Sequence, residues 1–359
     1  MKINIYDTFS AAELDWREFE ETGTCDVFQR YDWLSRWFKY IGKDEGFSPV
    51  LITVRNCIDE PLFMFPLAIQ TLYGLRMLTW LGGKLTDYQA PLIGRAGEKI
   101  SSDEFGSLWT EIKKKIDQFD LIYFVNQPEN IGNVKNPFVL YSTRANAECF
   151  RANIDKSLPY FANSLSKKIQ SDTRRQIGRL SLLGELKFVV AETTEERKDL
   201  TRKMIVQKQN KYLKTGVKNI FRSEKYKAFY EDMSTSFSQQ EIVHISALYV
   251  GDVVTATHWG MIWRDRFYYL MPGHESGQWD KYSTGRILLK KLMQCLENRE
   301  IKVFDFTIGS EKYKSQWANQ KEYVYEQLEA SSWRGTFFIL TQKAYRFAKR
   351  RLKKFYYLM

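Results

Sequence analysis

The chain has 359 residues, of which 44% are hydrophobic and 27% are charged, and it holds four scattered cysteines and only three histidines. A globular chain of this length is long enough for two domains, while the cysteine spacing excludes a disulfide framework and a structural zinc site. Neither a signal-peptide pattern nor a run of about 20 apolar residues is visible. We therefore expect a soluble, cytoplasmic protein without a bound metal.

Charge is distributed unevenly between the two halves. Residues 1–150 carry 16 Lys and Arg against 21 Asp and Glu, a net charge of −5, whereas residues 151–359 carry 38 against 22, a net charge of +16. This asymmetry predicts two modules, of which the second faces an anionic partner. A phosphorylated cofactor, a membrane surface, a nucleic acid and an acidic glycan all fit, and charge alone does not choose among them.

The first half predicts a strand, two helices, a meander of strands, a helix and a further strand. The helices are indicated by tryptophan-rich amphipathic patterns and a capped start, and the strands by runs of β-branched and aromatic residues. The expected elements are a strand at 2–7, helices at 11–22 and 31–42, strands at 48–56, 61–74 and 75–82, a helix at 101–119 and a strand at 120–128.

The second half predicts a similar order after a basic helix at 164–184. That helix carries the cations Lys167, Lys168, Arg174, Arg175 and Arg179. The expected elements then are a strand at 185–192, helices at 194–216 and 223–237, strands at 242–250, 253–263 and 266–273, a helix ending near 300, a strand at 302–309, a short helix at 310–318 and a strand at 321–330. We expect domains at 1–150 and 151–335, followed by a basic amphipathic helix at 336–359.

Residues 281–292, KYSTGRILLKKL, run from a hydroxyl-rich turn directly into an apolar helix. Ser283 and Thr284 are residue types that cap helix N-termini. The free N–H groups and the dipole of a helix N-terminus also favour anions. The segment therefore predicts a helix cap and, where the context supports it, a cradle for phosphate.

This order of elements, with its pyrophosphate-type turn, resembles the GNAT acyltransferase fold. More narrowly, SKKIQSDTRRQIGRLSLLGELKF (166–188), KYSTGRILLKKL (281–292) and KVFDFTIGSEKYKSQWA (302–318) resemble CelD-type polysaccharide-biosynthesis proteins, and LTWLGGKLTDYQAPLI (78–93) adds to the likeness. Its strongest part is the array of Asp305, Gly309, Glu311, Tyr313, Lys314 and Trp317. CelD-type proteins are in turn similar to the FemABX peptidoglycan aminoacyltransferases, which also pair two GNAT domains.

The resemblance implies a mixed α/β fold of two tandem GNAT-like domains, each a central, mostly antiparallel sheet flanked by helices. It implies acyl transfer from acetyl-CoA or another acyl-CoA to an amine or hydroxyl of a sugar, glycan or cell-envelope precursor in a bacterium. The acyl arm would lie beside Leu270 and Met271, and the pyrophosphate would lie on residues of the quoted turn, namely Ser283, Thr284, Gly285 and Arg286.

One departure from the family pattern concerns this turn. The usual Gln/Arg-x-x-Gly-x-Gly/Ala is replaced by Asp280-x-x-Ser283-x-Gly285. Serine keeps the backbone N–H that a phosphate would use, but the loss of glycine restricts close backbone approach. An acidic Asp280 beside phosphates is also unfavourable.

Acyl transfer needs a base, donors for the thioester oxyanion and an acid for the leaving thiolate. Asp305 ends a hydrophobic strand and is a candidate base, although it could equally pair with a nearby cation. His258 is a second candidate, with a hydrogen-bonded sheet histidine as the commoner alternative. Tyr313 lies where GNAT proteins often place their acid, and a packed tyrosine is the alternative. A backbone N–H of the strand at 266–273 would face the oxyanion.

Four further residues are expected on the substrate side. Glu311 and Lys314 belong to the second-half array, although an acid at a helix start is also ordinary N-terminal chemistry. Asp87 and Tyr88 lie in a loop that resembles the family's substrate-side loop, and we expect them at a cleft between the domains. The alternative there is an Asx turn after a glycine pair.

The C-terminal segment predicts a further contact. Residues 341–359 combine seven cations with aromatic side chains, a pattern typical of a helix lying on an anionic membrane surface. We expect peripheral contact with the inner face of the membrane, where lipid-linked precursors occur.

Alternative functions remain at this point. An aminoacyl-tRNA donor would follow from the FemABX resemblance, although residues 195–238 are too short for that family's helical-hairpin insertion. A non-catalytic accessory protein of polysaccharide biosynthesis would fit the altered turn at 280–285. Nucleic-acid binding, other than of a tRNA donor, is disfavoured because no RNA-binding motif occurs.

Overall fold

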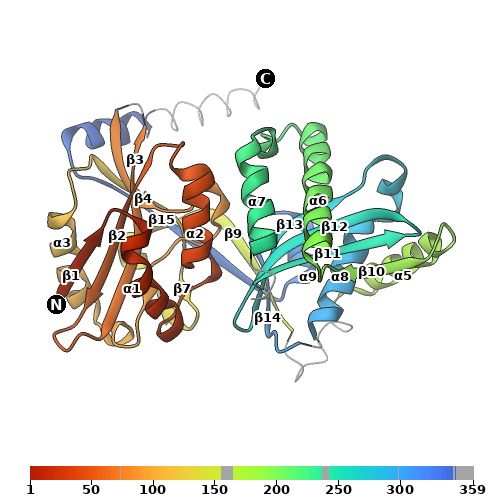
Figure 1. Cartoon of the computed structure of the whole chain (residues 1–359), viewed down its shortest axis with the longest axis horizontal. Helices are drawn as coiled ribbons and strands as arrows, with labels where there is room; N and C mark the ends of the chain where they lie inside the picture. Colours follow the sequence, from red (N-terminus) through yellow and green to blue (C-terminus); the bar gives the residue numbers. More distant parts are fainter. Residues whose placement is uncertain (73, 155–164, 237–241, 298, 343, 345–359) are drawn as a thin grey trace, which may run out of the picture. The chain divides into compact units, whose positions relative to one another are not determined.

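The computed structural model describes residues 1–72, 74–154, 165–236, 242–297, 299–342 and 344 (Figure 1). The chain divides into two compact units. Unit 1 comprises residues 1–146 together with 323–359, and unit 2 comprises residues 147–322. In sequence, unit 2 is thus inserted between the two parts of unit 1. Most of the C-terminal helix expected at 336–359 lies outside the described residues.

Unit 1 is built on a mixed sheet whose strands are mostly antiparallel. In spatial order they are β1 (Lys2–Tyr6), β2 (Phe47–Arg55), β3 (Pro61–Leu72), β4 (Leu75–Trp80), β6 (Leu121–Pro128) and β15 (Gln320–Ala330), with the short β5 (Leu92–Ile93) on β3. Only β4 and β6 pair in parallel. The accompanying helices are α1 (Phe9–Thr22), α2 (Tyr31–Trp37) and α3 (Ser102–Lys115).

The core of unit 1 is strongly aromatic. Phe65 of β3 and Trp109 of α3 are buried together with Phe138, whose ring lies 4.9 Å from that of Trp109 in an edge-to-face arrangement. Such pairs stabilise a core beyond the area they remove from water. A short hairpin of β7 (Asn130–Ile131) and β8 (Val134–Lys135) precedes Phe138.

Unit 2 repeats the same strand plan. Its strands, in spatial order, are β9 (Thr143–Asn153), β14 (Val303–Ile308), β13 (Arg266–His274), β12 (Val253–Trp263), β11 (Val243–Val250) and β10 (Leu186–Val190). Only β13 and β14 pair in parallel. The helices are α5 (Lys167–Ser181), α6 (Thr194–Thr215), α7 (Glu224–Ser236), α8 (Thr284–Glu297) and α9 (Lys312–Trp317).

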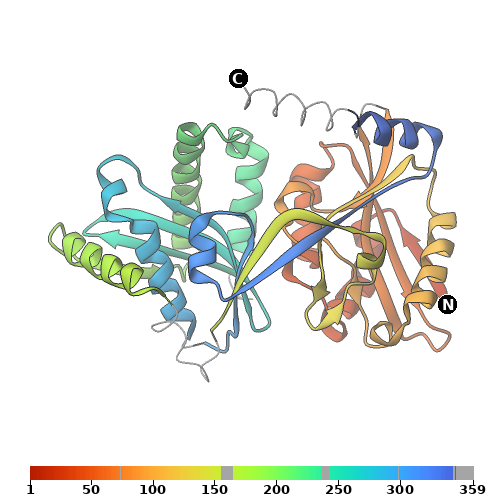
Figure 2. The same cartoon turned by 180° about the vertical axis from the view of Figure 1, so that it is seen from behind.

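Helices cover both faces of the sheet in unit 2 (Figures 1 and 2). Because side chains alternate along a strand, neighbouring residues of β12 meet different helices. Thr257 donates a hydrogen bond to Gln207 of α6 and Trp259 donates one to Ser234 of α7. Ala256 instead lies in a buried cluster with Ile287 of α8. Helices α6 and α7 therefore share one face, and α8 lies on the other.

The element order expected for both halves is observed, with mixed and mostly antiparallel sheets. The hairpin of β11 and β12 turns at Gly251, whose φ of +57° is the left-handed conformation that such turns require. Two features differ from expectation. The strand β9 was not expected, and β15, which was expected to belong to the second domain alone, pairs with β6 of unit 1.

Candidate functional site

Strands β13 and β14 separate part-way along their length. Their parallel pairing ends at Tyr268 and Asp305, while β13 continues to His274 and β14 to Ile308. Beyond that point the two strands share no ladder. Backbone N–H and C=O groups that would otherwise pair between the two strands therefore face the gap, where a ligand can form hydrogen bonds with them.

The course of β14 is set by a strained residue. Thr307 has a φ of +57°, a conformation that β-branched residues rarely adopt. Its N–H donates a 2.7 Å hydrogen bond to Oδ1 of Asp305. The pairing of β14 with β9 shifts register over the same residues. Strain of this kind persists where the surrounding structure enforces it, commonly at functional sites.

The course of β13 is altered by a bulge. Trp259 pairs with Met271 and Gly260 pairs with Tyr269, so that Leu270 is the extra residue. A bulge re-aims the backbone of the residue that it inserts. Leu270 and Met271, both expected to flank the acyl arm, thus lie where β13 has left β14.

The turn that leads into α8 is the segment that was expected to form the cradle. The N–H groups of Arg286 and Ile287 donate to the carbonyl oxygen of Ser283, while the N–H groups of Thr284 and Gly285 have no acceptor within the described residues. Ser283 has a φ of +54°, so serine adopts the conformation usually left to glycine. The cradle therefore offers two free amides at a helix N-terminus, a site suited to an anion.

The side chains around this turn are already engaged. The hydroxyl of Thr284 donates to the carbonyl of Thr255 at 3.2 Å, which leaves only its backbone for a phosphate. Asp280 accepts a hydrogen bond from the N–H of Gly277 at 3.0 Å and pairs with Lys214 at 3.5 Å. These partners compensate the charge of Asp280, which was expected to oppose phosphate binding.

Gly285 and Arg286, the other two residues of the cradle, differ in how closely they are packed. A Cβ at Gly285 would lie 3.8 Å from the ring of His274, an ordinary contact, so alanine fits there. Arg286 pairs with Asp172 of α5 at 3.3 Å. Asp172 also pairs with Arg175 at 2.6 Å, so α5 places its cations beside the cradle.

Asp305 is fully buried and enclosed by cations. Its Oδ2 accepts a hydrogen bond from Nε of Arg151 at 2.9 Å and lies 3.7 Å from Nη1 of Arg266. With Thr307 bound to the other oxygen, the geometry matches the ion-pair alternative considered for this residue. Its visible role is to hold β14 in the bent path that opens the gap.

His258 is also buried, on the α8 face of the sheet. Its ring stacks on that of Tyr269 with centroids 4.2 Å apart, and neither ring nitrogen has a hydrogen-bond partner within the described residues. Burial, followed by the charges of His244 and Lys208, holds the pKa of His258 well below its usual value. Burial likewise lowers the pKa of His244 to about 3. Both imidazoles are therefore neutral at physiological pH.

The expected acid, Tyr313, lies at the gap. Its ring centroid is 6.5 Å from that of Tyr269 and 6.3 Å from that of Phe306. Burial, with a smaller contribution from Glu311, raises the pKa of Tyr313, so its hydroxyl remains protonated. A protonated hydroxyl is what a leaving thiolate would need.

Glu311 and Lys314 form a pair next to Tyr313. Lys314 lies 3.2 Å from Glu311 and donates a hydrogen bond to the carbonyl of Ile308 at 2.7 Å. Burial opposes it, but Lys314 nevertheless lowers the pKa of Glu311. The pair bridges the end of β14 to α9.

Lys208 of α6 was not singled out from the sequence. It is 8% exposed, and its ammonium has neither a hydrogen bond nor an ion pair with any described residue. Burial, together with the charges of Lys211 and Lys314 and against that of Glu311, lowers the pKa of Lys208 to about 7. The five lysines of α6 look alike in sequence, and only their packing distinguishes them.

The remaining expected residues belong to unit 1. Tyr88 is fully buried against Phe28, and its carbonyl accepts a 2.6 Å hydrogen bond from Gln29. Asp87 precedes it and is partly buried. In this geometry Tyr88 is a core residue of unit 1.

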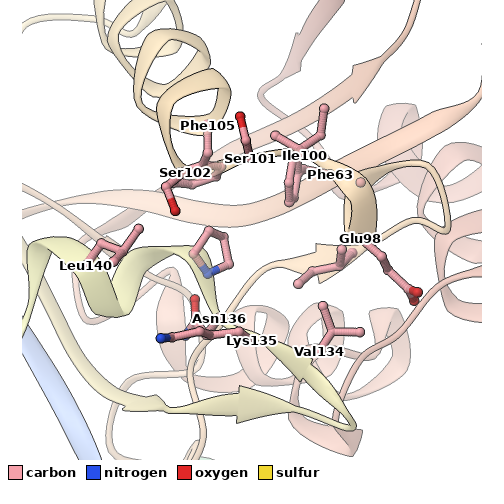
Figure 3. A pocket seen from close by; sticks show the side chains of 13 residues that line it. Phe63, Glu98, Ile100, Ser101, Ser102, Phe105, Val134, Lys135, Asn136 and Leu140 are labelled. Carbon is pink, nitrogen blue, oxygen red and sulfur yellow. The ribbon is translucent and has the colours of Figure 1, made fainter.

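Unit 1 has its own pocket at the start of α3 (Figure 3). Phe63, Phe105 and Leu140 line it together with Glu98 and the serines at positions 101 and 102. The N-terminus of α3 is closed by a capping box between Ser101 and Glu104. Since this box uses the amides and Glu98 adds negative charge, the pocket is unlike the cradle of α8.

No group of three or more His, Cys, Asp or Glu side chains within the described residues is arranged to hold a metal ion. The helices of that part of the chain also include none that is long and apolar enough to cross a bilayer.

Three solved structures share the fold of nearly the whole chain. FemX covers 91% of this chain and 97% of its own, with a TM-score of 0.62 and 9% identity. A conserved protein of unknown function from Bacteroides thetaiotaomicron VPI-5482 covers 92% and 100%, with a TM-score of 0.57 and 11% identity. The C-terminal domain of a putative lysylphosphatidylglycerol synthetase from Agrobacterium fabrum covers 93% and 96%, with a TM-score of 0.51 and 9% identity. Identities this low establish a common fold only.

The sequence comparison adds a family for part of the chain. No curated protein matches the chain. Residues 167–315, however, match the family described as an acetyltransferase (GNAT) domain, which confirms the GNAT resemblance for the segment that holds the gap and the cradle. The expected fold class is confirmed for both units. The comparisons therefore support a GNAT-like fold for both units and a match to the GNAT acetyltransferase family for residues 167–315.

Proposed function

We propose that unit 2 transfers an acyl group from an acyl-CoA thioester, such as acetyl-CoA, to an amine or hydroxyl acceptor. One observation carries the proposal. The gap between β13 and β14 lies beside the bulge at Leu270 and ends toward a helix whose first amides, at Thr284 and Gly285, are free. A gap between strands that is followed by an anion-binding helix N-terminus suits a long donor molecule with an acyl arm at one end and phosphates at the other.

Each part of the site then has a task. The pyrophosphate would accept hydrogen bonds from the amides of Thr284 and Gly285, while the acyl arm would occupy the gap next to Met271. The N–H of Leu270 is the candidate donor to the thioester oxygen, which gains negative charge as the acceptor attacks. Tyr313 would protonate the leaving thiolate, consistent with its protonated hydroxyl.

We place the acceptor among sugars, glycans and cell-envelope precursors. The support is the CelD-type likeness of residues 166–188, 281–292 and 302–318. We further propose that the protein acts in the cytoplasm, at the inner face of the membrane, through its basic C-terminal segment. Co-sedimentation with vesicles of 30% phosphatidylserine, comparing the full chain with residues 1–340, tests the membrane contact, and equal binding by both would refute it.

Calorimetry with acetyl-CoA tests the donor site directly. Gly285→Trp places an indole in the cradle, whereas Gly285→Ala adds a Cβ at an ordinary 3.8 Å from His274. We expect the wild type and Gly285→Ala to bind and Gly285→Trp to lose binding at least tenfold. Absence of binding by the wild type at millimolar acetyl-CoA would refute the acyl-CoA donor.

A second donor, aminoacyl-tRNA, is favoured by one observation. The exposed cations of α5 adjoin the cradle, since the guanidinium of Arg179 lies 5.1 Å from the ring centre of Tyr282 and Arg286 pairs with Asp172. Such a surface suits a polyanion larger than CoA. If acetyl-CoA fails, aminoacyl-tRNA binding that Arg174→Glu with Arg175→Glu abolishes would establish this donor. Failure of both donors would leave the accessory role.

A further inference from the structure

The side chain of Lys208 is buried without a counter-charge. Its Nζ lies 5.7 Å from the ring centre of Tyr212, and no described carboxylate pairs with it. Lysine side chains are rarely buried to this extent unless they are paired, because moving an ammonium out of water costs free energy. None of the contacts described for the donor uses it.

Helix α6 packs against the part of β13 that lies beyond its pairing with β14. The side chain of Gln207 receives a 2.7 Å hydrogen bond from Thr257 and lies against Gly273, which belongs to the part of β13 beyond its pairing with β14. Lys208 follows on the helix, and its charge interacts with Glu311 and Lys314 at the end of β14. Lys208 therefore lies on the α6 side of the sheet, close enough to the end of β14 for the charges of Glu311 and Lys314 to act on it.

The other titratable groups near the gap are unsuited to accept a proton on that side. Asp305 is enclosed by Arg151 and Arg266, and Glu311 is paired with Lys314. His258 and Tyr269 lie on the α8 face, stacked on each other. His274 also lies on that face, because it pairs with Ala256 and its ring adjoins Gly285 of α8. A donor whose phosphates lie at α8 would present its acyl carbon to the gap, so an acceptor would approach from the α6 side.

We propose that Lys208 is the general base that takes a proton from the acceptor. This inference rests on the proposed acyl transfer and deepens it. For an ammonium acceptor, the Lys208 amine takes one proton, and the freed amine attacks the thioester carbonyl, forming the C–N bond. The C–S bond then breaks, the thiolate receives a proton from Tyr313, and the nitrogen of the new amide returns one to Tyr313. Lys208 finally releases its proton to solvent.

The electrostatic surroundings support this role. The charges that face Lys208 are Lys211 on its own helix and the pair Glu311 and Lys314 at α9. The imidazoles of His258 and His274 also interact with it, and burial lowers the pKa of both. Burial and the two lysines lower the pKa of Lys208 to about 7, and Glu311 opposes them. At neutral pH about half of the molecules would then carry an uncharged amine, which suits a general base.

The first experiment measures the protonation of Lys208 without any substrate. Urea unfolding of the wild type and Lys208→Met is compared at pH 7 and pH 9. An unfolded lysine with a pKa of 10.5 binds its proton in this range, while the folded one with a pKa of about 7 releases it. The wild type should therefore gain stability relative to Lys208→Met as the pH rises. We expect the ratio of their unfolding constants to change about fiftyfold. A constant ratio would overturn the proposal.

The second experiment separates a base from an anion-binding cation. Acetyl transfer from acetyl-CoA to glucosamine, used as a probe amine, is measured for the wild type, Lys208→Met, Lys208→Arg and the exposed-lysine control Lys218→Met. Arginine keeps the charge but cannot lose its proton. We expect both Lys208 variants to fall 10²–10⁴-fold in kcat and Lys218→Met to remain unchanged. Activity retained by Lys208→Arg would overturn the base.

The two failures can be told apart. If the wild type transfers nothing to the probe and does not bind acetyl-CoA, the proposed donor fails whatever the state of Lys208. If transfer occurs and is lost in Gly285→Trp, but survives in Lys208→Met, the donor site stands and the base is refuted.

Discussion

The guanidinium Nε of Arg151 lies 2.9 Å from Oδ2 of Asp305, and both side chains are almost completely buried. Asp305, which the sequence indicated as a candidate base, therefore has a structural role beside the gap. Its second oxygen holds the N–H of Thr307, where β14 turns away from β13. An ion pair thus maintains the gap in which a donor would lie.

Removal of this carboxylate should destabilise the protein. Asp305→Ala leaves Arg151 and Arg266 buried with one partner fewer, and we expect the free energy of unfolding to fall by about 3–5 kcal/mol. Urea denaturation measures this loss, with exposed Glu300→Ala as the control, for which a change within about 0.5 kcal/mol is expected. A stable Asp305→Ala protein that merely lacks activity would instead identify Asp305 as a base.

Replacement of the strained serine in the cradle should stabilise the protein. Ser283 has a φ of +54°, which glycine adopts without penalty, so Ser283→Gly should raise the free energy of unfolding by about 0.5–1 kcal/mol. Gly216→Ala at the end of α6 is the control in the opposite direction. Gly216 has a φ of +68° and no atom within 4 Å of an added Cβ, so only backbone strain should act, and the free energy of unfolding should fall by about 1 kcal/mol. Thermal unfolding measures both, and equal shifts in the same direction would contradict the argument.

The buried histidines should make the fold sensitive to acid. The folded-state pKa of His244 is about 3, against 6.5 for the free side chain. Below pH 6.5 the unfolded chain therefore binds a proton that the folded chain excludes, and stability falls with pH. Between pH 8 and pH 5 this one residue should cost about 2 kcal/mol. Stability curves for His244→Phe, in which that loss should disappear, provide the measurement.

His258 provides a separate test of catalysis. Its ring stacks on Tyr269 and both nitrogens are buried, so His258→Phe keeps the stacking and removes two unsatisfied polar atoms. We expect a protein that is at least as stable as the wild type below pH 6 and retains acyl transfer within about threefold, because the ring of His258 is buried and stacked on Tyr269. A hundredfold loss of kcat with an intact fold would restore His258 as a candidate base.

Much of unit 2 could be predicted because its strands alternate and its helices are capped. The strand expected at 253–263 coincides with β12, and the helix expected at 194–216 ends at Thr215 before Gly216 in the left-handed conformation. Strand β9, by contrast, has the sequence TRANAECFRAN, in which polar and small residues interrupt the alternation. Its pairing with β14 depends on partners about 150 residues away.

The site was predictable in its backbone and less so in its side chains. A helix start after a small-residue turn is a local signal, and α8 begins at Thr284 as expected, while its role as a phosphate cradle stays a prediction. The surroundings of Asp305 depend on Arg151, which is 154 positions away in the sequence, so the choice between base and ion pair could not be made locally. Lys208 depends in the same way on the packing of α6, since nothing in its neighbourhood along the chain distinguishes a buried lysine from an exposed one.

The return of β15 to unit 1 has a consequence for synthesis in the cell. Leu328 of β15 pairs with Tyr123 of β6. The sheet of unit 1 therefore cannot be completed until the ribosome has added some 200 residues beyond β6. At about 5–20 residues per second the wait is about 10–40 s. During it the edge of β6 stays open to foreign strands. The inserted unit meets no such delay, because its last strand, β14, emerges before β15. Nascent chains should therefore complete unit 2 first and unit 1 afterwards.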